Sequence, residues 1–216
     1  MELPVAIHRV RAGAEEFRVV RPGRPPTHAV LLDHDRHLDL YLDASAARTL
    51  AALWMLAARS PHSLIHLPVR ANRLPAHGVP DDVGFPLDLV LLHHSLQFAP
   101  ARWKGLRRRL GPGLPQTASL PEVEREQTAV AGAARHHREN HDLFHQHLHA
   151  ETLFMTGSAK VFRETARHFL DVAREGPVYV PTHPRRPCYE TVFHSNDGIL
   201  GNAREIRVEY CDQWLP

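Results

Sequence analysis

Histidines at four-residue spacing are the clearest chemical feature of the sequence. They are His137, His141, His145 and His149, within a stretch over residues 121–155 that holds a single glycine and no proline after its first residue. Because four residues make slightly more than one turn of an α-helix, the spacing predicts a ladder of imidazoles along one side of a helix. Imidazole binds transition metals and changes charge near neutral pH, so the ladder indicates metal or proton chemistry.

The ladder is not uniform when it is placed on a helical wheel at about 100° per residue. His137 and His141 fall inside the apolar stripe that contains Phe144. His145 lies at the edge of this stripe, and the drift of the ladder carries His149 to its flank. A polar side chain in a core is costly unless it finds a partner, so the inward histidines need partners within the protein.

A second helix is predicted over residues 159–175, after a break at Gly157 and Ser158. Two helices with so short a joint pack antiparallel, which brings His168 toward the ladder. Helical bundles build metal sites from such facing side chains. The sequence therefore predicts a site for Zn, Fe or Mn with ligands drawn from His137, His141, His145, His168 and Asp171. Two alternatives stay open: histidines hydrogen-bonded in a polar helix interface, and a metal-free cluster that responds to pH.

A second candidate group follows the most apolar predicted strand, residues 87–92. This strand ends in His93, His94 and Ser95. Ligands of open sheets collect at the carboxyl ends of strands, so we expect His94 and His93 to be catalytic, with His94 as the acid or base. The alternative is a strand end that reaches solvent. Ser95 lacks the G-x-S-x-G elbow of a hydrolase nucleophile.

A third candidate is a basic run in a short helix predicted over residues 100–110. Its cations are Arg102, Lys104, Arg107, Arg108 and Arg109. Such a run can hold a phosphate, a nucleotide or nucleic acid, but it is more often a solvated helix face. Trp103 is its one interleaved aromatic residue, so nucleic acid is disfavoured as a partner.

The order of the expected elements predicts an α+β fold. The first half is rich in strands and holds two helices, and an antiparallel helical hairpin and a C-terminal β-hairpin follow. We expect strands over residues 5–10, 17–21, 28–33, 37–43, 63–70 and 87–92, and helices over 44–59 and 100–110. Residues 1–110 are expected to form a mixed α/β subdomain, 111–120 a linker, and 121–216 the two hairpins, packed together as one compact domain.

Local patterns add detail. Alternation over residues 37–43 predicts that Leu38, Leu40 and Leu42 face the core, with Asp39 and Tyr41 outward. Pro68 argues for an edge position of the strand over 63–70. The long loop over 71–86 is a candidate lid. The C-terminal strands, over 188–193 and 205–211, match if Thr191 faces Val208 and Phe193 faces Ile206.

Composition narrows the class of protein. The chain has 216 residues, 43% of them hydrophobic, a formal net charge of +2, 18 histidines and two cysteines. So small a net charge creates no global field for nucleic acid, and two cysteines exclude a disulfide framework. Because the sequence has neither an apolar run of about 18–20 residues nor a signal-peptide pattern at Met1, we expect a cytoplasmic protein with no membrane partner.

These observations favour an enzyme that acts on a small molecule, with its site between residues 93–95 and the helical hairpin. A metal, if bound, would be held mainly by His141, His145 and His168. The second hypothesis is a non-catalytic binding or regulatory protein whose histidine-rich helix is an interface, including one between copies of the chain. The third is phosphate, nucleotide or nucleic-acid binding through residues 102–109.

Overall fold

A computed structural model describes residues 1–79, 83–121, 139–183, 188–201 and 203–215. The strands are β1 (Glu2–Ala12), β2 (Glu15–Pro22), β3 (Ala29–Asp33), β4 (Leu38–Leu42), β5 (Ser63–Leu67), β6 (Phe85–His93), β7 (Leu114–Ser119), β8 (His145–Leu148), β9 (Thr152–Gly157), β10 (Glu190–Phe193) and β11 (Ile206–Tyr210). The helices are α1 (Ala44–Arg59), α2 (Trp103–Arg107) and α4 (Ala159–Thr182), with short 3-10 helices η1 (Pro100–Arg102) and η2 (Ser195–Asp197). The expected α+β class is therefore confirmed.

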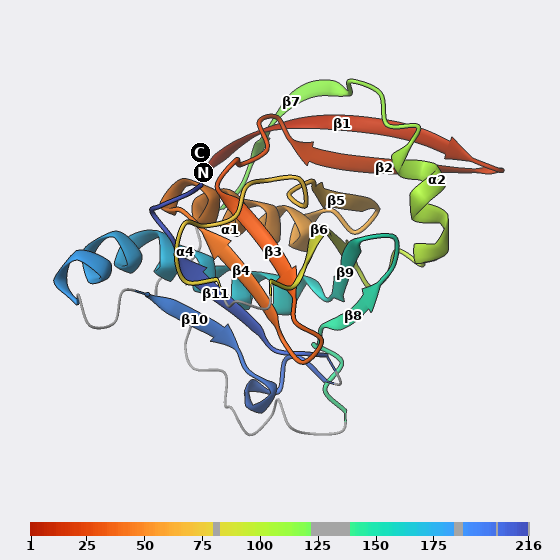
Figure 1. Cartoon of the computed structure of the whole chain (residues 1–216). Helices are drawn as coiled ribbons and strands as arrows, with labels where there is room; N and C mark the ends of the chain where they lie inside the picture. The colour runs from red at the N-terminus through yellow and green to blue at the C-terminus, as the bar shows by residue number, and fades with distance from the viewer. Residues whose placement is uncertain (80–82, 122–138, 184–187, 202, 216) are drawn as a thin grey trace.

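The sheet forks at β6. One edge of β6 pairs with β5, while the other pairs first with β3, over residues 85–87, and then in parallel with β9, over residues 88–93. The strand order is β10-β11-β4-β3-β6-β5-β2-β1-β7, and β8 extends the branch that begins with β9 (Figure 1). The fork brings the carboxyl ends of β6 and β9 side by side.

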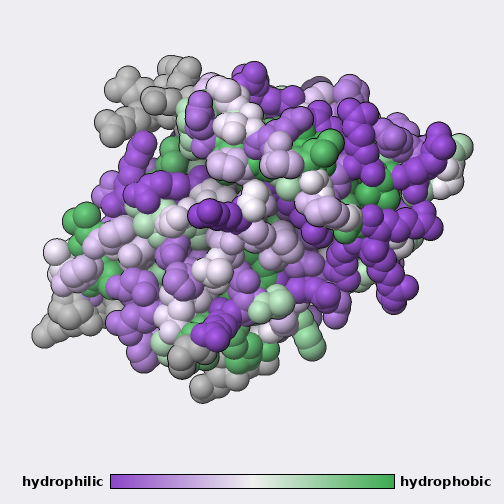
Figure 2. Space-filling model, turned by 90° about the horizontal axis from the view of Figure 1, so that it is seen from above, coloured by the Kyte–Doolittle hydropathy of each residue, from purple (hydrophilic) through white to green (hydrophobic). Residues whose placement is uncertain are grey.

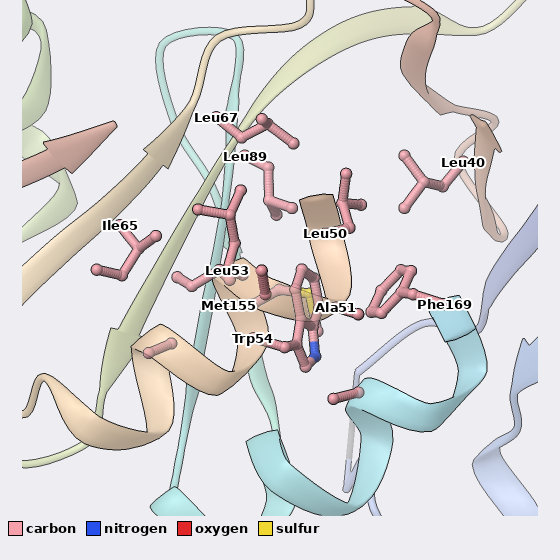
Figure 3. Packing of buried hydrophobic residues seen from close by; sticks show 14 of the residues in the cluster. Leu40, Leu50, Ala51, Leu53, Trp54, Ile65, Leu67, Leu89, Met155 and Phe169 are labelled. Atoms are coloured by element: carbon pink, nitrogen blue, oxygen red, sulfur yellow. The ribbon is translucent and has the colours of Figure 1, made fainter. Parts of the chain in front are cut away.

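Helices α1 and α4 pack against each other on one face of this sheet, and α2 covers part of the other face. Asp43 caps α1, because its side chain accepts a hydrogen bond from the backbone N–H of Ala46 at 2.6 Å. The helix predicted over residues 44–59 is confirmed at both ends. Trp54 of α1 points toward Phe169 of α4, with ring centroids 4.5 Å apart (Figure 3). This contact forms the centre of the main core.

Residues 139–155 do not form the predicted helix. Residues 139–144 are irregular, and the antiparallel strands β8 and β9 follow them. Between these strands, Ala150 and Glu151 both have positive φ. A spacing of four residues is even, so it places histidines on one face of a strand as well as on one side of a helix. The expected helical hairpin is therefore wrong within the described residues, and α4 packs on α1 instead. Residues 122–138 lie outside the described residues.

Other boundaries also differ from expectation. Strand β5 ends at Leu67, before Pro68, and lies between β2 and β6 rather than at an edge. Residues 114–119, expected in a linker, form β7 and pair with β1. Helix α4 continues beyond Gly176, which does not adopt the positive φ of a helix-ending glycine. Among the residues that the structure describes, no helix is long and apolar enough to cross a membrane.

Two expected patterns of pairing and burial can be compared directly with the strands. The C-terminal register is confirmed, with Thr191 opposite Val208. Leu40 is buried as expected, but Tyr41, predicted to face outward, is only 1% exposed. The reason is that Leu74, Val79 and Trp214 cover the outer face of β3 and β4. Asp39 is buried on the same face, at 5% exposure.

Gly176 of α4 lies close against Tyr210 of β11, and we expect Gly176→Ala to destabilise the protein. An added Cβ would lie 2.3 Å from Cγ of the buried Tyr210 side chain. Alanine normally stabilises a helix relative to glycine by about 1 kcal/mol, but here overpacking should lower the free energy of unfolding by about 1–3 kcal/mol. Urea denaturation measures the change. Gly105→Ala in α2, whose Cβ would meet nothing within 4 Å, is the control and should lose no stability.

Candidate functional site

The carboxyl ends of β6 and β9 carry both predicted catalytic histidines. His93 is the last residue of β6, and the backbone N–H of His94 donates to the carbonyl oxygen of Gly157, the last residue of β9, at 3.0 Å. The two imidazole rings lie 4.4 Å apart, edge to face. The strand end thus places two adjacent imidazoles where a parallel pair of strands terminates.

His93 is held by a short turn. Its Nδ1 accepts from the backbone N–H of Ser95 at 3.2 Å and lies 2.8 Å from the Ser95 hydroxyl, which also reaches the Pro61 carbonyl oxygen at 3.3 Å. Burial, and then the neighbouring His94 and His62, lower the pKa of His93. His93 is therefore neutral at pH 7, and its hydrogen bonds assign the ring proton to Nε2.

Asp142 is the residue of this strand end that the sequence did not reveal. Its Oδ1 accepts from the hydroxyl of Ser158, the N-cap of α4, at 2.7 Å, and its Oδ2 lies 3.0 Å from Nζ of Lys160. Burial opposes ionisation, but Ser158, Lys160 and the nearby His94 outweigh it and lower the pKa of Asp142. Asp142 is therefore a carboxylate held beside the start of α4. Ser158, which follows the end of β9, provides this contact, and no spacing in the sequence reveals it.

A pocket of about 340 Å³ lies along β8, the strand that pairs with β9. It is lined by His145, Gln146, His147, Leu148, Ala203 and Arg204. The Gln146 side chain holds the backbone of Arg204, because it donates to the carbonyl oxygen at 2.9 Å and accepts from the N–H at 3.0 Å. Two such bonds to one residue fix the wall of the pocket.

Arg204 also anchors the pocket to the turn after β3. Its guanidinium donates to both carboxylate oxygens of Asp33, and Nη1 also donates to the carbonyl oxygen of Asp35 at 2.8 Å. Burial works against ionisation of Asp33, yet Arg204 outweighs it and lowers the pKa of Asp33. A bidentate pair of this kind holds both side chains in one geometry.

The histidines of the pocket alternate along β8. His145 and His147 are two residues apart in one strand and share its face, and the ring of His149 lies 6.4 Å from that of His147. On a helical wheel His147 points away from the ladder, so sequence reasoning missed it. The signal was the period-two run from His145 to His149, which is typical of a strand.

Within the described residues, the predicted metal ligands form no group of three that could hold a metal ion. His145 lines the pocket, while the His168 ring lies 4.7 Å from that of Phe193. Asp171 is also on α4, where burial raises its pKa, and His141 lies in the irregular segment before β8. His137 is outside the described residues. Among the residues that the structure describes, no three His, Cys, Asp or Glu side chains are arranged to hold a metal ion. The missing helical hairpin is the physical reason.

A second group of ionisable side chains surrounds Asp88, in the middle of β6 and 3% exposed. Its Oδ2 lies 3.1 Å from Nη1 of Arg107 and 3.4 Å from Nε of Arg70, and 3.6 Å from Nε2 of the buried His66. Arg21 donates from Nε to Nδ1 of His66 at 2.9 Å. The cluster thus uses Arg107, part of the predicted basic run, as an internal counterion rather than as a surface cation.

Comparisons with known proteins identify no relative. No family model matches the chain, and no similar protein is found among curated proteins or among solved structures. The interpretation of function therefore depends on the geometry of this chain alone.

Proposed function

We propose that the protein is an enzyme that acts on a small molecule by proton transfer, with the substrate in the β8 pocket. The observation that carries the proposal is the pocket of about 340 Å³ that His145 and His147 line together with the fixed Arg204. Its volume lies within the range of about 300–1,000 Å³ typical of ligand pockets. Imidazole is the side chain best suited to give and take protons near neutral pH.

Two places within this region can supply the acid and base. The first is the pocket itself, through His145 and His147. The second is the strand end, which carries the adjacent imidazoles of His93 and His94. The carboxylate of Asp142 is a further candidate in this region. The groups of this region that can transfer a proton are imidazoles and a carboxylate.

A non-catalytic binding or regulatory protein is the alternative. The same pocket would then bind its ligand without converting it. The β8 strand favours this reading in one respect, because β9 is its only strand partner within the described ranges, which leaves an edge exposed to another molecule.

Ligand-observed NMR with a metabolite library tests the proposal. We expect at least one compound to bind and to be converted during the measurement. His145→Ala and His147→Ala should each lower turnover of that compound by about 100-fold or more if the pocket supplies the acid or base. His94→Ala and Asp142→Asn should do so if the strand end supplies it. The exposed His77 lies in the loop before β6, and His77→Ala is the matched control.

The outcomes separate the hypotheses. Conversion that depends on either pair of residues supports the enzyme. Binding without conversion, lost in His147→Ala, supports the binding protein instead. A compound whose binding and conversion survive all four substitutions would remove the site from consideration.

A further inference from the structure

A second pocket, of about 290 Å³, lies between α2 and the turn that joins β1 to β2. It is lined by Ala12, Gly13, Arg102, Gly105, Leu106 and Arg109. Figure 1 shows α2 beside this turn, at the far end of the long β1–β2 hairpin. In Figure 2, hydrophilic residues gather at the same end of the molecule. This pocket is separate from the β8 pocket, and nothing in the proposed function uses it.

The two arginines of the pocket are held in place from β1 and β2. Arg102 donates from Nη2 to the carbonyl oxygen of Ala12 at 2.6 Å, and its guanidinium carbon lies 4.7 Å from the centroid of the Phe17 ring. Arg109 donates from Nη1 to the carbonyl oxygen of Arg11 at 3.0 Å. Each guanidinium has five N–H donors, so these bonds leave donors for a ligand. Positioned side chains also lose less entropy when they bind.

The walls between the arginines are open. A Cβ added at Gly13 or at Gly105 would meet nothing within 4 Å. Gly13 has φ of +69°, a conformation that favours glycine. The backbone of the turn therefore disfavours a side chain at this position. A ligand can therefore approach the backbone of the turn and the face of α2 without displacing a side chain.

The charge of the pocket is positive. One carboxylate, Glu15, forms an ion pair with Arg102, and within the described residues Arg109 forms no ion pair with a carboxylate. Lys104 of α2 and Arg108, which directly follows α2, add two exposed cations. Guanidinium forks match the oxygen geometry of phosphate. No aromatic side chain lines the pocket in the part of the chain described, and Trp103 is fully buried, so a base has no stacking surface there.

We propose that the pocket between α2 and the β1–β2 turn binds a phosphate group, with Arg102 and Arg109 as its guanidinium partners. The phosphate can belong to a small molecule or to the backbone of a nucleic acid, because both present the same phosphate oxygens to the guanidinium groups. Glu15 competes with it for Arg102. The arginines of the basic run then have two roles. Arg102 and Arg109 bind the phosphate, while Arg107 is the counterion of Asp88.

Calorimetric titration of the whole protein with pyrophosphate is the first test. Arg109→Gln should weaken binding about tenfold or more, since it removes a charge-assisted contact. Glu15→Gln should tighten binding, because it frees Arg102. Arg24→Gln, at an exposed arginine near the opposite end of the hairpin, is the control and should bind as the wild type does. Circular dichroism melting of each variant establishes that it is folded.

A labelled single-stranded oligonucleotide distinguishes the two sources of phosphate. Tighter binding of the oligonucleotide than of pyrophosphate, with competition between them, identifies a nucleic-acid backbone as the ligand. Binding of pyrophosphate alone identifies a small phosphorylated molecule. The proposal is overturned if the folded wild type binds neither probe, or if Arg109→Gln and Arg24→Gln reduce binding equally, which would indicate only general attraction to positive charge.

Discussion

Replacement of Asp88 by asparagine is expected to lower the free energy of unfolding by about 3–5 kcal/mol. The Asp88 side chain is 5% exposed and faces Arg107, which is 19% exposed, at 3.1 Å. Asparagine keeps the shape of the side chain and removes its charge. The guanidinium groups of Arg107 and Arg70 would then lie in the protein without their shared counterion, and a buried charge without a partner is costly.

Urea denaturation of wild type and Asp88→Asn measures this loss. Glu151→Gln is the matched control, because Glu151 also pairs with Arg70 and Arg107 but its side chain is 64% exposed. An exposed pair contributes about 0–1 kcal/mol, so this variant should change little. Equal losses in the two variants would contradict the picture of Asp88 as a desolvated counterion.

The parts of the fold that sequence predicts well are those determined by local patterns. Helix α1 follows from its apolar spacing, and it appears over the predicted residues 44–59. The C-terminal hairpin follows from two alternating segments, whose apolar sets match in a single register, with Phe193 opposite Ile206. In each case the residues that determine the element are close together in the chain.

The candidate site was less predictable, because its contacts depend on pairing between distant segments. Four-residue spacing fits a helix and a strand equally, so the ladder did not distinguish β8 from a helix. Asp142 meets Ser158 only through the fold of the chain, because Asp142 precedes β8 and Ser158 follows β9. The cluster around Asp88 draws residues from β2, β5, β6 and α2, and no short motif joins them. The histidine spacing did not predict which histidines meet, because the topology of the sheet determines that.

When the protein is acidified, His66 and Glu209 should change the free energy of unfolding in opposite directions. Burial, the largest effect, lowers the pKa of His66 from 6.5 to about 4, although Asp88 opposes the shift. The unfolded chain takes up this proton near pH 6.5, so His66 contributes stability above that pH and loses it as the pH falls through about 4. The loss approaches about 3 kcal/mol, at 1.36 kcal/mol per pKa unit.

Glu209 acts in the opposite direction. Burial, together with Glu190 and Asp39, raises the pKa of Glu209 from 4.5 to about 7. Its contribution to stability is complete below pH 4.5 and is lost as the pH rises through about 7. Between about pH 4.5 and 6.5 the two effects have opposite slopes, so the wild type should show a shallow pH dependence of stability there.

Glu209→Gln is expected to uncover the contribution of His66. Glutamine cannot titrate. The free energy of unfolding of the variant should therefore fall steeply from pH 6.5 to 4.5, by about 2–3 kcal/mol more than that of the wild type. At pH 8 the same variant should be more stable than the wild type, because it no longer holds a carboxylate that resists ionisation in the folded protein. Urea denaturation at several pH values measures both differences, with Glu2→Gln at an exposed position of β1 as the control. Parallel pH profiles for Glu209→Gln and wild type would show that burial of Glu209 does not control its titration.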